Sequence, residues 1–195
     1  MKKYKIVVVL LCFFFSINNY CQNKNEKESK ISKTDFPSSA LQTLSLVPEN
    51  AKRIKYYQET DGEKLSYECK FKFQNLWHSV EFNEDGKLED IEVKVRKHQL
   101  SQTVRERINN YLSQNSDKFD IVKIQEQYVQ DKSSSDLTFF KSTISNREHT
   151  ASNYELIVAI KHKKDWTLKE MTFDKQGNFT NTRDLQTDSY EYIMY

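Results

Sequence analysis

The stretch 67–95, with its alternating apolar and polar residues, constrains this chain most strongly. In its first run, Tyr67, Cys69 and Phe71 alternate with charged residues, which is the period of a strand with one buried face. A second alternating run leads to Gly86, where glycine supplies the positive φ that a tight hairpin turn requires, and a third run follows. The stretch 67–95 therefore predicts a three-stranded antiparallel meander.

The chain contains this order of signals twice. Residues 154–160 and 166–173 have the same strand patterns, and Gly177 takes the place of Gly86. The offset between the two copies is 87 to 91 residues. Such an internal repeat predicts that two similar units follow one another in the chain.

A helix and a further strand are predicted ahead of each meander. The first helix covers 36–47, with Pro37 at a position that suits a helix start, and a strand over 51–60 follows it. The second helix begins after Ser101 as N-cap and is followed by a strand over 119–129. Both helices have one apolar face, which must be buried.

The predicted fold class is α+β: a tandem repeat of a helix plus a four-stranded antiparallel sheet, with the helices on one face of a continuous sheet. The other sheet face is then left to solvent or to a partner. The segments are a signal peptide (1–21), a disordered tether (22–34), a first repeat (35–97), a second repeat (98–187) with an insertion near 130–150, and a C-terminal tail (188–195). The insertion starts with loop composition, and Leu137 to Ile144 is predicted to extend a strand.

The N-terminus has the pattern of a secretory signal. A basic start is followed by the apolar run 6–15 and by a polar stretch that ends at Cys21. Two outcomes are open: cleavage after Cys21 with simple export to the periplasm or exterior, or lipidation of Cys21 and anchoring to a membrane. The low hydrophobicity of 22–34 predicts a disordered tether.

Charge and cysteine content argue against a nucleic-acid-binding protein and against a disulfide-stabilised one. The segment 1–21 holds three lysines and no acidic residue, so the remaining chain has 27 basic against 28 acidic residues. A nucleic-acid partner normally requires a strongly basic surface, so none is expected. Only Cys69 remains after cleavage at Cys21, so no internal disulfide forms, and its place on an apolar strand face predicts a buried, unreactive thiol.

No catalytic or metal-binding motif is visible. The four histidines are scattered without the spacing of a zinc site and are expected on the surface or in loops. Three glycines in the whole chain exclude phosphate-binding loops, and no nucleophile-elbow motif exists. The acidic run from Glu81 to Glu92 is interpreted as a hairpin turn with a solvated strand face. We therefore predict no catalytic residue, no metal and no cofactor.

Two tryptophans are the candidate binding residues. Trp77 lies five residues before Phe82, and Trp166 lies seven before Phe173. Odd spacings place both indoles on the sheet face opposite the apolar one, at equivalent positions of the two repeats. Exposed tryptophan on a sheet face is typical of protein interfaces, although both could instead cover the hairpin tips.

Several short motifs resemble the PepSY-like, or β-lactamase-inhibitor-like, exported proteins of Bacteroidetes. They are Phe36-Pro37 at the first helix, Tyr-Glu-Cys-Lys-Phe at 67–71, Val-Glu-Phe-Asn-Glu-Asp-Gly at 80–86, and their counterparts at 154–158 and 173–177. The resemblance covers about 35–185. It implies two helix-on-sheet units joined in one sheet, and a non-catalytic binding protein that acts on an envelope peptidase or hydrolase. The family's Asn-Gly turn is replaced here by 74–76 and 162–165.

Three functions remain open at this point. The first is an exported binding protein whose open sheet face engages a protein or peptide of the cell envelope. The second is a structural or ligand-carrying envelope protein, and the third is a hydrolase with dispersed carboxylates. A flat apolar patch on the sheet favours the first, and a deep pocket with converging polar groups favours the third.

Overall fold

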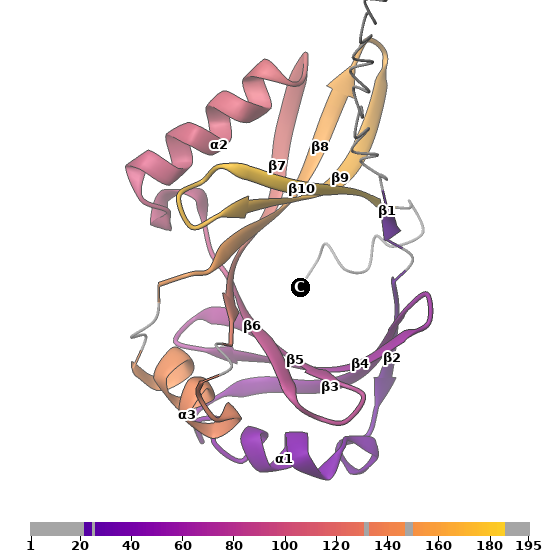
Figure 1. Cartoon of the computed structure of the whole chain (residues 1–195), viewed down its shortest axis with the longest axis vertical. Helices are drawn as coiled ribbons and strands as arrows, with labels where there is room; N and C mark the ends of the chain where they lie inside the picture. Colours follow the sequence, from indigo (N-terminus) through magenta and orange to yellow (C-terminus); the bar gives the residue numbers. More distant parts are fainter. Residues whose placement is uncertain (1–21, 25, 131–132, 147–149, 186–195) are drawn as a thin grey trace, which may run out of the picture.

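A single ten-stranded sheet organises the computed structural model, which describes residues 22–24, 26–130, 133–146 and 150–185. The strand order is β1-β10-β9-β8-β7-β6-β5-β4-β3-β2 (Figure 1). Each neighbouring pair is antiparallel except β1 and β10, which are parallel. The predicted α+β class with one continuous sheet is confirmed.

The elements follow one another in a simple order. The N-terminal half contains β1 (Gln22–Lys24), β2 (Glu26–Ile31), a 3₁₀ turn (Lys33–Asp35), α1 (Ser38–Leu44), β3 (Lys52–Asp61), β4 (Lys64–Phe73), β5 (Leu76–Asn83) and β6 (Leu88–Lys94). The C-terminal half contains a 3₁₀ turn (Lys97–Gln99), α2 (Gln102–Gln114), β7 (Lys118–Val129), α3 (Asp136–Lys141), a π-helical turn (Ser142–Asn146), β8 (Asn153–His162), β9 (Asp165–Asp174) and β10 (Phe179–Leu185).

The helices all lie outside the curve of the sheet, on the side that we call the outer face (Figure 1). Leu44 of α1, Ile108 of α2 and Phe140 of α3 are buried in one hydrophobic cluster with the apolar strand residues, such as Phe71 and Leu156. Alternation along each strand places those apolar residues on the outer face and the charged residues on the opposite, concave side, which we call the inner face. The prediction that α1 and α2 pack on the same side of one sheet is confirmed.

Two equivalent turns attach the helices to the sheet. At 83–87 the Asn83 side chain accepts hydrogen bonds from the backbone N–H groups of Asp85 and Lys87 at 3.1 and 2.9 Å. At 174–178 the Asp174 side chain accepts the same two bonds, at 2.9 and 2.8 Å. Each turn contains a glycine with positive φ that packs against the start of a helix. This equivalence supports the tandem-repeat interpretation, which stays a prediction.

The N-terminal strands bring the two edges of the sheet together. β1 pairs with β10 at one edge, whereas β2 pairs with β3 at the other, and one residue separates β1 from β2. Two trans peptide units span at most about 7 Å, so the edges cannot be far apart at this point. Arg183 of β10 also lies 3.5 Å from Asp61 of β3, measured from Nη1 to Oδ2. The sheet therefore closes into a ring on this side (Figure 1).

The expectation of a disordered tether over 22–34 is wrong for the described residues. β2 pairs with β3 over six residues, and Ser32 caps the 3₁₀ turn that follows. Low hydrophobicity suggested disorder, but a strand at a sheet edge gains its hydrogen bonds from the neighbouring backbone, whatever its side chains. Glu28 also forms an ion pair with Lys70 at 2.8 Å.

The strand expected over Leu137 to Ile144 is also wrong. This segment forms α3 and the π-helical turn, with Ser135 as N-cap accepting from the backbone N–H of Thr138 at 3.3 Å. Phe139, Phe140 and Ile144 enter the core, a spacing that belongs to a helix rather than to a strand. The short apolar run fitted both periods, and the N-cap decides between them.

The other predicted elements agree with the structure to within a few residues. The first helix begins at Ser38 rather than at Phe36, because Pro37 has extended backbone and takes the N-cap position. Ser101 caps α2 as predicted. The boundary between the predicted repeats, at 97/98, lies in the 3₁₀ turn after β6, and β6 pairs directly with β7 across it. The predicted signal peptide and tail, 1–21 and 188–195, lie outside the described residues.

Substituting Gly62 and Gly86 should separate backbone strain from packing. All three have positive φ, between 63° and 83°. A Cβ at Gly86 would lie 2.6 Å from Pro37 Cβ, whereas a Cβ at Gly62 meets nothing within 4 Å. Gly62→Ala should therefore cost only the left-handed backbone penalty of about 1–2 kcal/mol. Gly86→Ala should add about 1–3 kcal/mol for overpacking. Urea denaturation measures both, and equal losses would show that the turn does not press on α1.

The single thiol in the described residues should be inert. Cys69 is fully buried, and burial together with the neighbouring Glu68 raises the pKa of its thiol to about 12. Because the thiolate is the reactive form, labelling by a thiol reagent at pH 8 should be slow until denaturant is added. Rapid labelling of the folded protein would contradict the predicted burial.

Candidate functional site

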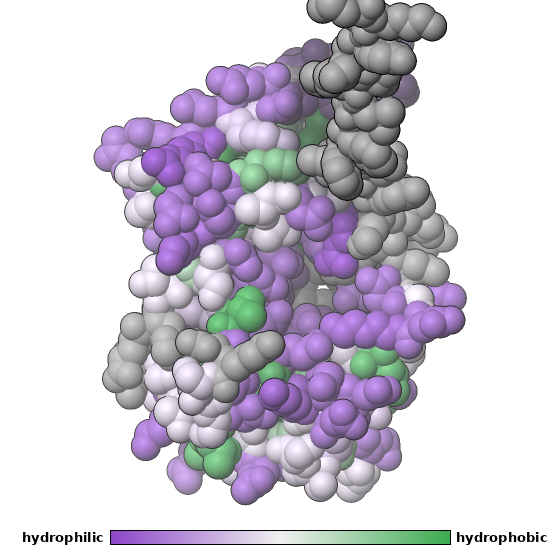
Figure 2. Space-filling model, in the orientation of Figure 1, coloured by the Kyte–Doolittle hydropathy of each residue, from purple (hydrophilic) through white to green (hydrophobic). Residues whose placement is uncertain are grey.

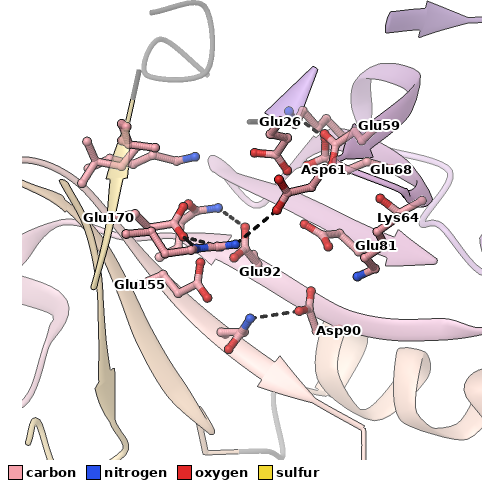
Figure 3. A pocket seen from close by; sticks show the side chains of 18 residues that line it. Glu26, Glu59, Asp61, Lys64, Glu68, Glu81, Asp90, Glu92, Glu155 and Glu170 are labelled. Atoms are coloured by element: carbon pink, nitrogen blue, oxygen red, sulfur yellow. Dashed lines mark hydrogen bonds and ion pairs between the residues drawn. The ribbon is translucent and has the colours of Figure 1, made fainter. Parts of the chain in front are cut away.

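The inner face of the sheet forms a polar cavity of about 300 Å³. Nine of its lining side chains are carboxylic acids: Glu26, Glu59, Asp61, Glu68, Glu81, Asp90, Glu92, Glu155 and Glu170 (Figure 3). Four are basic: Lys64, Lys70, Lys123 and Arg183. The visible surface around it is largely hydrophilic, with scattered apolar spots (Figure 2). Acidic groups thus outnumber basic ones by about two to one.

Strand register explains why the acids gather here. Glu68 of β4 lies directly opposite Glu81 of β5, and Glu81 lies directly opposite Asp90 of β6. Cross-strand neighbours of like charge destabilise a sheet. Three carboxyl groups in one row across adjacent strands are therefore an arrangement that stability alone does not favour.

One side of the cavity neutralises its acids with a buried lysine. The Lys70 ammonium lies 2.8 Å from Glu28 Oε2 and 2.7 Å from Glu68 Oε2. Burial alone would lower the pKa of Lys70, but Glu68 and Glu28 outweigh it and raise the pKa. Burial would raise the pKa of Glu68, yet Lys70 and hydrogen bonds from Glu59 and Ser79 lower it. Lys70 and Glu68 are therefore a charged pair at neutral pH.

Glu59 has the opposite protonation state. Burial, the charge of Glu68 and a hydrogen bond to Glu68 raise the pKa of Glu59 far above its ordinary value. Glu59 is therefore protonated at neutral pH and donates to the Glu68 carboxylate. Carboxylate oxygens of Glu28, Glu59 and Glu68 lie within 4.8 Å of one another, close enough for metal ligands. The Lys70 ammonium, however, already lies between two of these carboxylates, which gives the cluster a cation of its own.

The opposite side uses an arginine in the same way. The guanidinium of Arg183 donates to Glu170 Oε1, with Nε at 2.9 Å, and also contacts Asp61. Burial would lower the pKa of Arg183, but Glu170 raises it. This group joins β10 to β9 and reaches across the ring to β3.

The floor of the cavity contains Asp90. Its Oδ2 accepts a hydrogen bond from the Gln127 amide at 2.9 Å, whereas its Oδ1 is buried and has no hydrogen-bond partner among the described residues. Burial and the charges of Glu81, Glu92 and Glu155 raise the pKa of Asp90 well above its ordinary value. The interpretation of the acidic run 81–92 as a solvated strand face is therefore wrong for Glu81, Asp90 and Glu92, which line the cavity.

Both predicted tryptophans lie on the inner face. Trp77 alternates with Ser79 and Glu81 of β5, is partly exposed, and lines a smaller hollow that shares Lys70, Lys123 and Gln125 with the cavity. Arg53 lies over its ring, 5.9 Å from the centroid. Trp166 lies four residues before Glu170 on β9, so both side chains are on the same face. It is 52% exposed near the β8–β9 turn and lines neither hollow. Their role in binding stays a prediction.

The histidines divide into different environments. His98 and His162 are exposed as expected, and His149 lies outside the described residues. His78 is buried, contrary to expectation, and its ring stacks on Phe71 with centroids 5.2 Å apart.

Among the described residues, no helix is long and apolar enough to cross a membrane.

Comparison with solved structures identifies the architecture. A DUF2874 family protein from Bacteroides ovatus matches with a TM-score of 0.54 at 13% identity, covering 82% of this chain and 96% of that one. The fold is therefore similar to that of this DUF2874 family protein. A putative periplasmic protein from Bacteroides eggerthii matches with a TM-score of 0.52 at 11% identity, over 81% and 94% of the two chains. The resemblance to Bacteroidetes proteins is thus confirmed as a likeness of fold.

A BLIP-like protein from Bacteroides fragilis matches with a TM-score of 0.47 at 14% identity, over 76% of this chain and 86% of that one. The sequence matches no protein-family model. It also matches no curated protein.

Replacing Glu59 should reveal its protonation through the pH dependence of stability. Its carboxyl keeps its proton in the folded chain but loses it in the unfolded chain above about pH 4.5. The unfolded state then binds fewer protons, so the contribution of Glu59 to stability falls as pH rises from 4.5 towards the raised pKa. Glu59→Gln keeps a hydrogen-bond donor for Glu68, and because its amide does not titrate, it removes the loss of stability with rising pH. It should raise the denaturation midpoint at pH 8 more than at pH 5. Equal shifts at both values would contradict a protonated Glu59.

Proposed function

We propose that the chain is an exported, non-catalytic binding protein of the cell envelope that holds part of a protein or peptide partner against its inner sheet face. The observation that carries this proposal is the acidic cavity on the face opposite the helices. Its groups are placed by strand register, and the like charges that register brings together are more easily explained by a bound cation than by stability.

Export is supported by the secretory pattern of the first 21 residues. It also agrees with the periplasmic description of the B. eggerthii protein that shares the fold. Cleavage after Cys21 and lipidation at Cys21 remain alternatives within this proposal. In both, the inner face is available to partners outside the cytoplasm.

The inner face is not the flat apolar patch expected of a protein interface, and its converging carboxyl groups also fit the alternative of a hydrolase with dispersed carboxylates. It offers a charged hollow with an aromatic side chain, Trp77, beside it. Electrostatic complementarity of this kind gives specificity and fast association with a partner of opposite charge. We therefore expect a partner that presents basic residues, and inhibition of an envelope peptidase or other hydrolase is the form of binding that we propose.

A pull-down from envelope extract tests the role of the tryptophans. Trp77→Ala and Trp166→Ala, separately and together, are compared with Leu137→Ala, which removes a partly exposed apolar side chain from α3 on the outer side. Truncation of an interface hot spot typically costs at least about 2 kcal/mol, so the Trp77 variant should retain the partner poorly. Leu137→Ala should retain it fully.

Circular dichroism must show that each variant is folded. A folded double variant that keeps every partner would contradict a role for the tryptophans on the inner face. Unfolding of the double variant would mean that the indoles contribute to the core.

A ligand-carrying protein is the second candidate, favoured by the concave shape and polar lining of the cavity. A volume of about 300 Å³ is at the lower end for ligand pockets in proteins, roughly 300–1,000 Å³. The two candidates differ in whether the cationic group in the cavity belongs to a macromolecule or to a small molecule.

A further inference from the structure

Asp90 differs from the acids that form ion pairs with Lys70 and Arg183, because its direct hydrogen-bond donor is a neutral amide. Within the part of the chain that the structure describes, its Oδ1 is buried without a hydrogen-bond partner, and its carboxyl points into the cavity (Figure 3). The carboxyl accepts a direct hydrogen bond from the neutral amide of Gln127, at 2.9 Å. A buried carboxyl oxygen without a hydrogen-bond partner is costly, and it is satisfied when a donor enters.

The charges that face Asp90 come from several elements. Glu81 lies on β5, Glu92 on β6 and Glu155 on β8, and all three raise the pKa of Asp90. On β4, the exposed Lys64 interacts with Asp90 and Glu81 but forms its close ion pair with Glu89, at 2.7 Å. On β10, Arg183 interacts with Glu155 but donates hydrogen bonds to Glu170. The nearby field is therefore dominated by negative charge and attracts a cation.

The same cavity shows which cations its acids accept. Lys70 places an ammonium group between Glu28 and Glu68, and Arg183 places a guanidinium group against Glu170 and Asp61. Both are nitrogen cations on flexible aliphatic chains. Space for about ten water molecules, at ~30 Å³ each, would accommodate another such chain. Ile157 lines the cavity and offers an apolar contact for its methylene groups.

We propose that Asp90, together with Glu81 and Glu155, forms a subsite for a primary ammonium or guanidinium group. The subsite rests on the proposed function, because it names the chemistry of the group that the inner face holds. A lysine or arginine side chain of a partner protein is one source of such a group, and a free polyamine is the other. The nitrogen donates to Asp90 Oδ1, and its charge offsets the like charges around it.

Binding of a cation here should release a proton. The bound positive charge favours ionised Asp90, whereas the empty site favours its protonated form. The affinity for the cation should therefore increase with pH until the pH reaches the raised pKa of Asp90. Because a proton is released, the heat of binding should depend on the ionisation enthalpy of the buffer.

Titration calorimetry of the mature chain, residues 22–195, tests the subsite with four probes. They are spermidine, the blocked peptide Gly-Gly-Lys-Gly-Gly, its glutamine counterpart, and calcium chloride. Spermidine or the lysine peptide should bind with proton release, and the glutamine peptide should not bind. Stronger binding of the lysine peptide points to a protein source, and stronger binding of spermidine to a small amine.

Asp90→Asn should weaken this binding at least tenfold and abolish the proton release. Glu106→Gln is the matched control, because it makes the same chemical change on the exposed surface of α2 and should alter neither. Unchanged affinity in Asp90→Asn, or wild-type binding without proton release, would overturn the proposal. So would a lack of binding to both amines at tens of millimolar, or binding of calcium alone. The proton release is measured on the wild type and does not depend on the variant folding.

The outcomes also separate the subsite from the proposed function. If Asp90→Asn still captures the envelope partner in full while the Trp77 variant does not, the binding function holds and the subsite is wrong. If the wild-type chain binds spermidine through Asp90 but captures no macromolecule, the subsite holds and the proposed function is wrong.

Discussion

The alternation of side chains along the strands is the constraint on which the rest of the structure depends. Every strand that contributes an apolar residue to the outer face contributes its neighbours to the inner face. Leu156 and Val158 of β8 lie under the helices, so Glu155 and Ile157 line the cavity. Because one sheet runs through the whole described chain, burying one continuous core also creates one continuous polar face.

Curvature turns that polar face into a site. A flat sheet would leave the carboxylates in water, where their repulsion is weak. Here the sheet edges meet through β1 and β2, and Arg183 reaches Asp61 across the ring. Charges of one sign are thus held close together and partly out of water, which raises the pKa of Glu59 and of Asp90. The closed ring and the acidic cavity are one feature of the fold.

Local sequence patterns could predict most of the fold and little of the site. Strand periods, Gly86, Gly177 and the Ser101 cap were visible because each depends on neighbouring residues. The β4–β5 turn was less visible, because Gln74 and Asn75 adopt positive φ without a glycine. The alternation of side chains along each strand would also have placed Glu68, Glu81 and Glu155 on the face opposite the apolar residues. What no local pattern contains is the closure of the sheet, since β2 pairs through its backbone and its polar side chains resemble those of a disordered segment.

The most direct test of this account is a carboxyl ¹³C NMR titration of residues 22–195. If the inner face is a closed acidic cavity, Glu59 and Asp90 should titrate well above their ordinary pKa values of 4.5 and 3.8. Asp174, in the β9–β10 turn, provides an internal reference: slight burial acts to raise its pKa, but hydrogen bonds from Asn178 and Gln176 lower it. If Glu59 and Asp90 titrate at ordinary values while Asp174 is lowered, the inner face is open to water and the account is wrong.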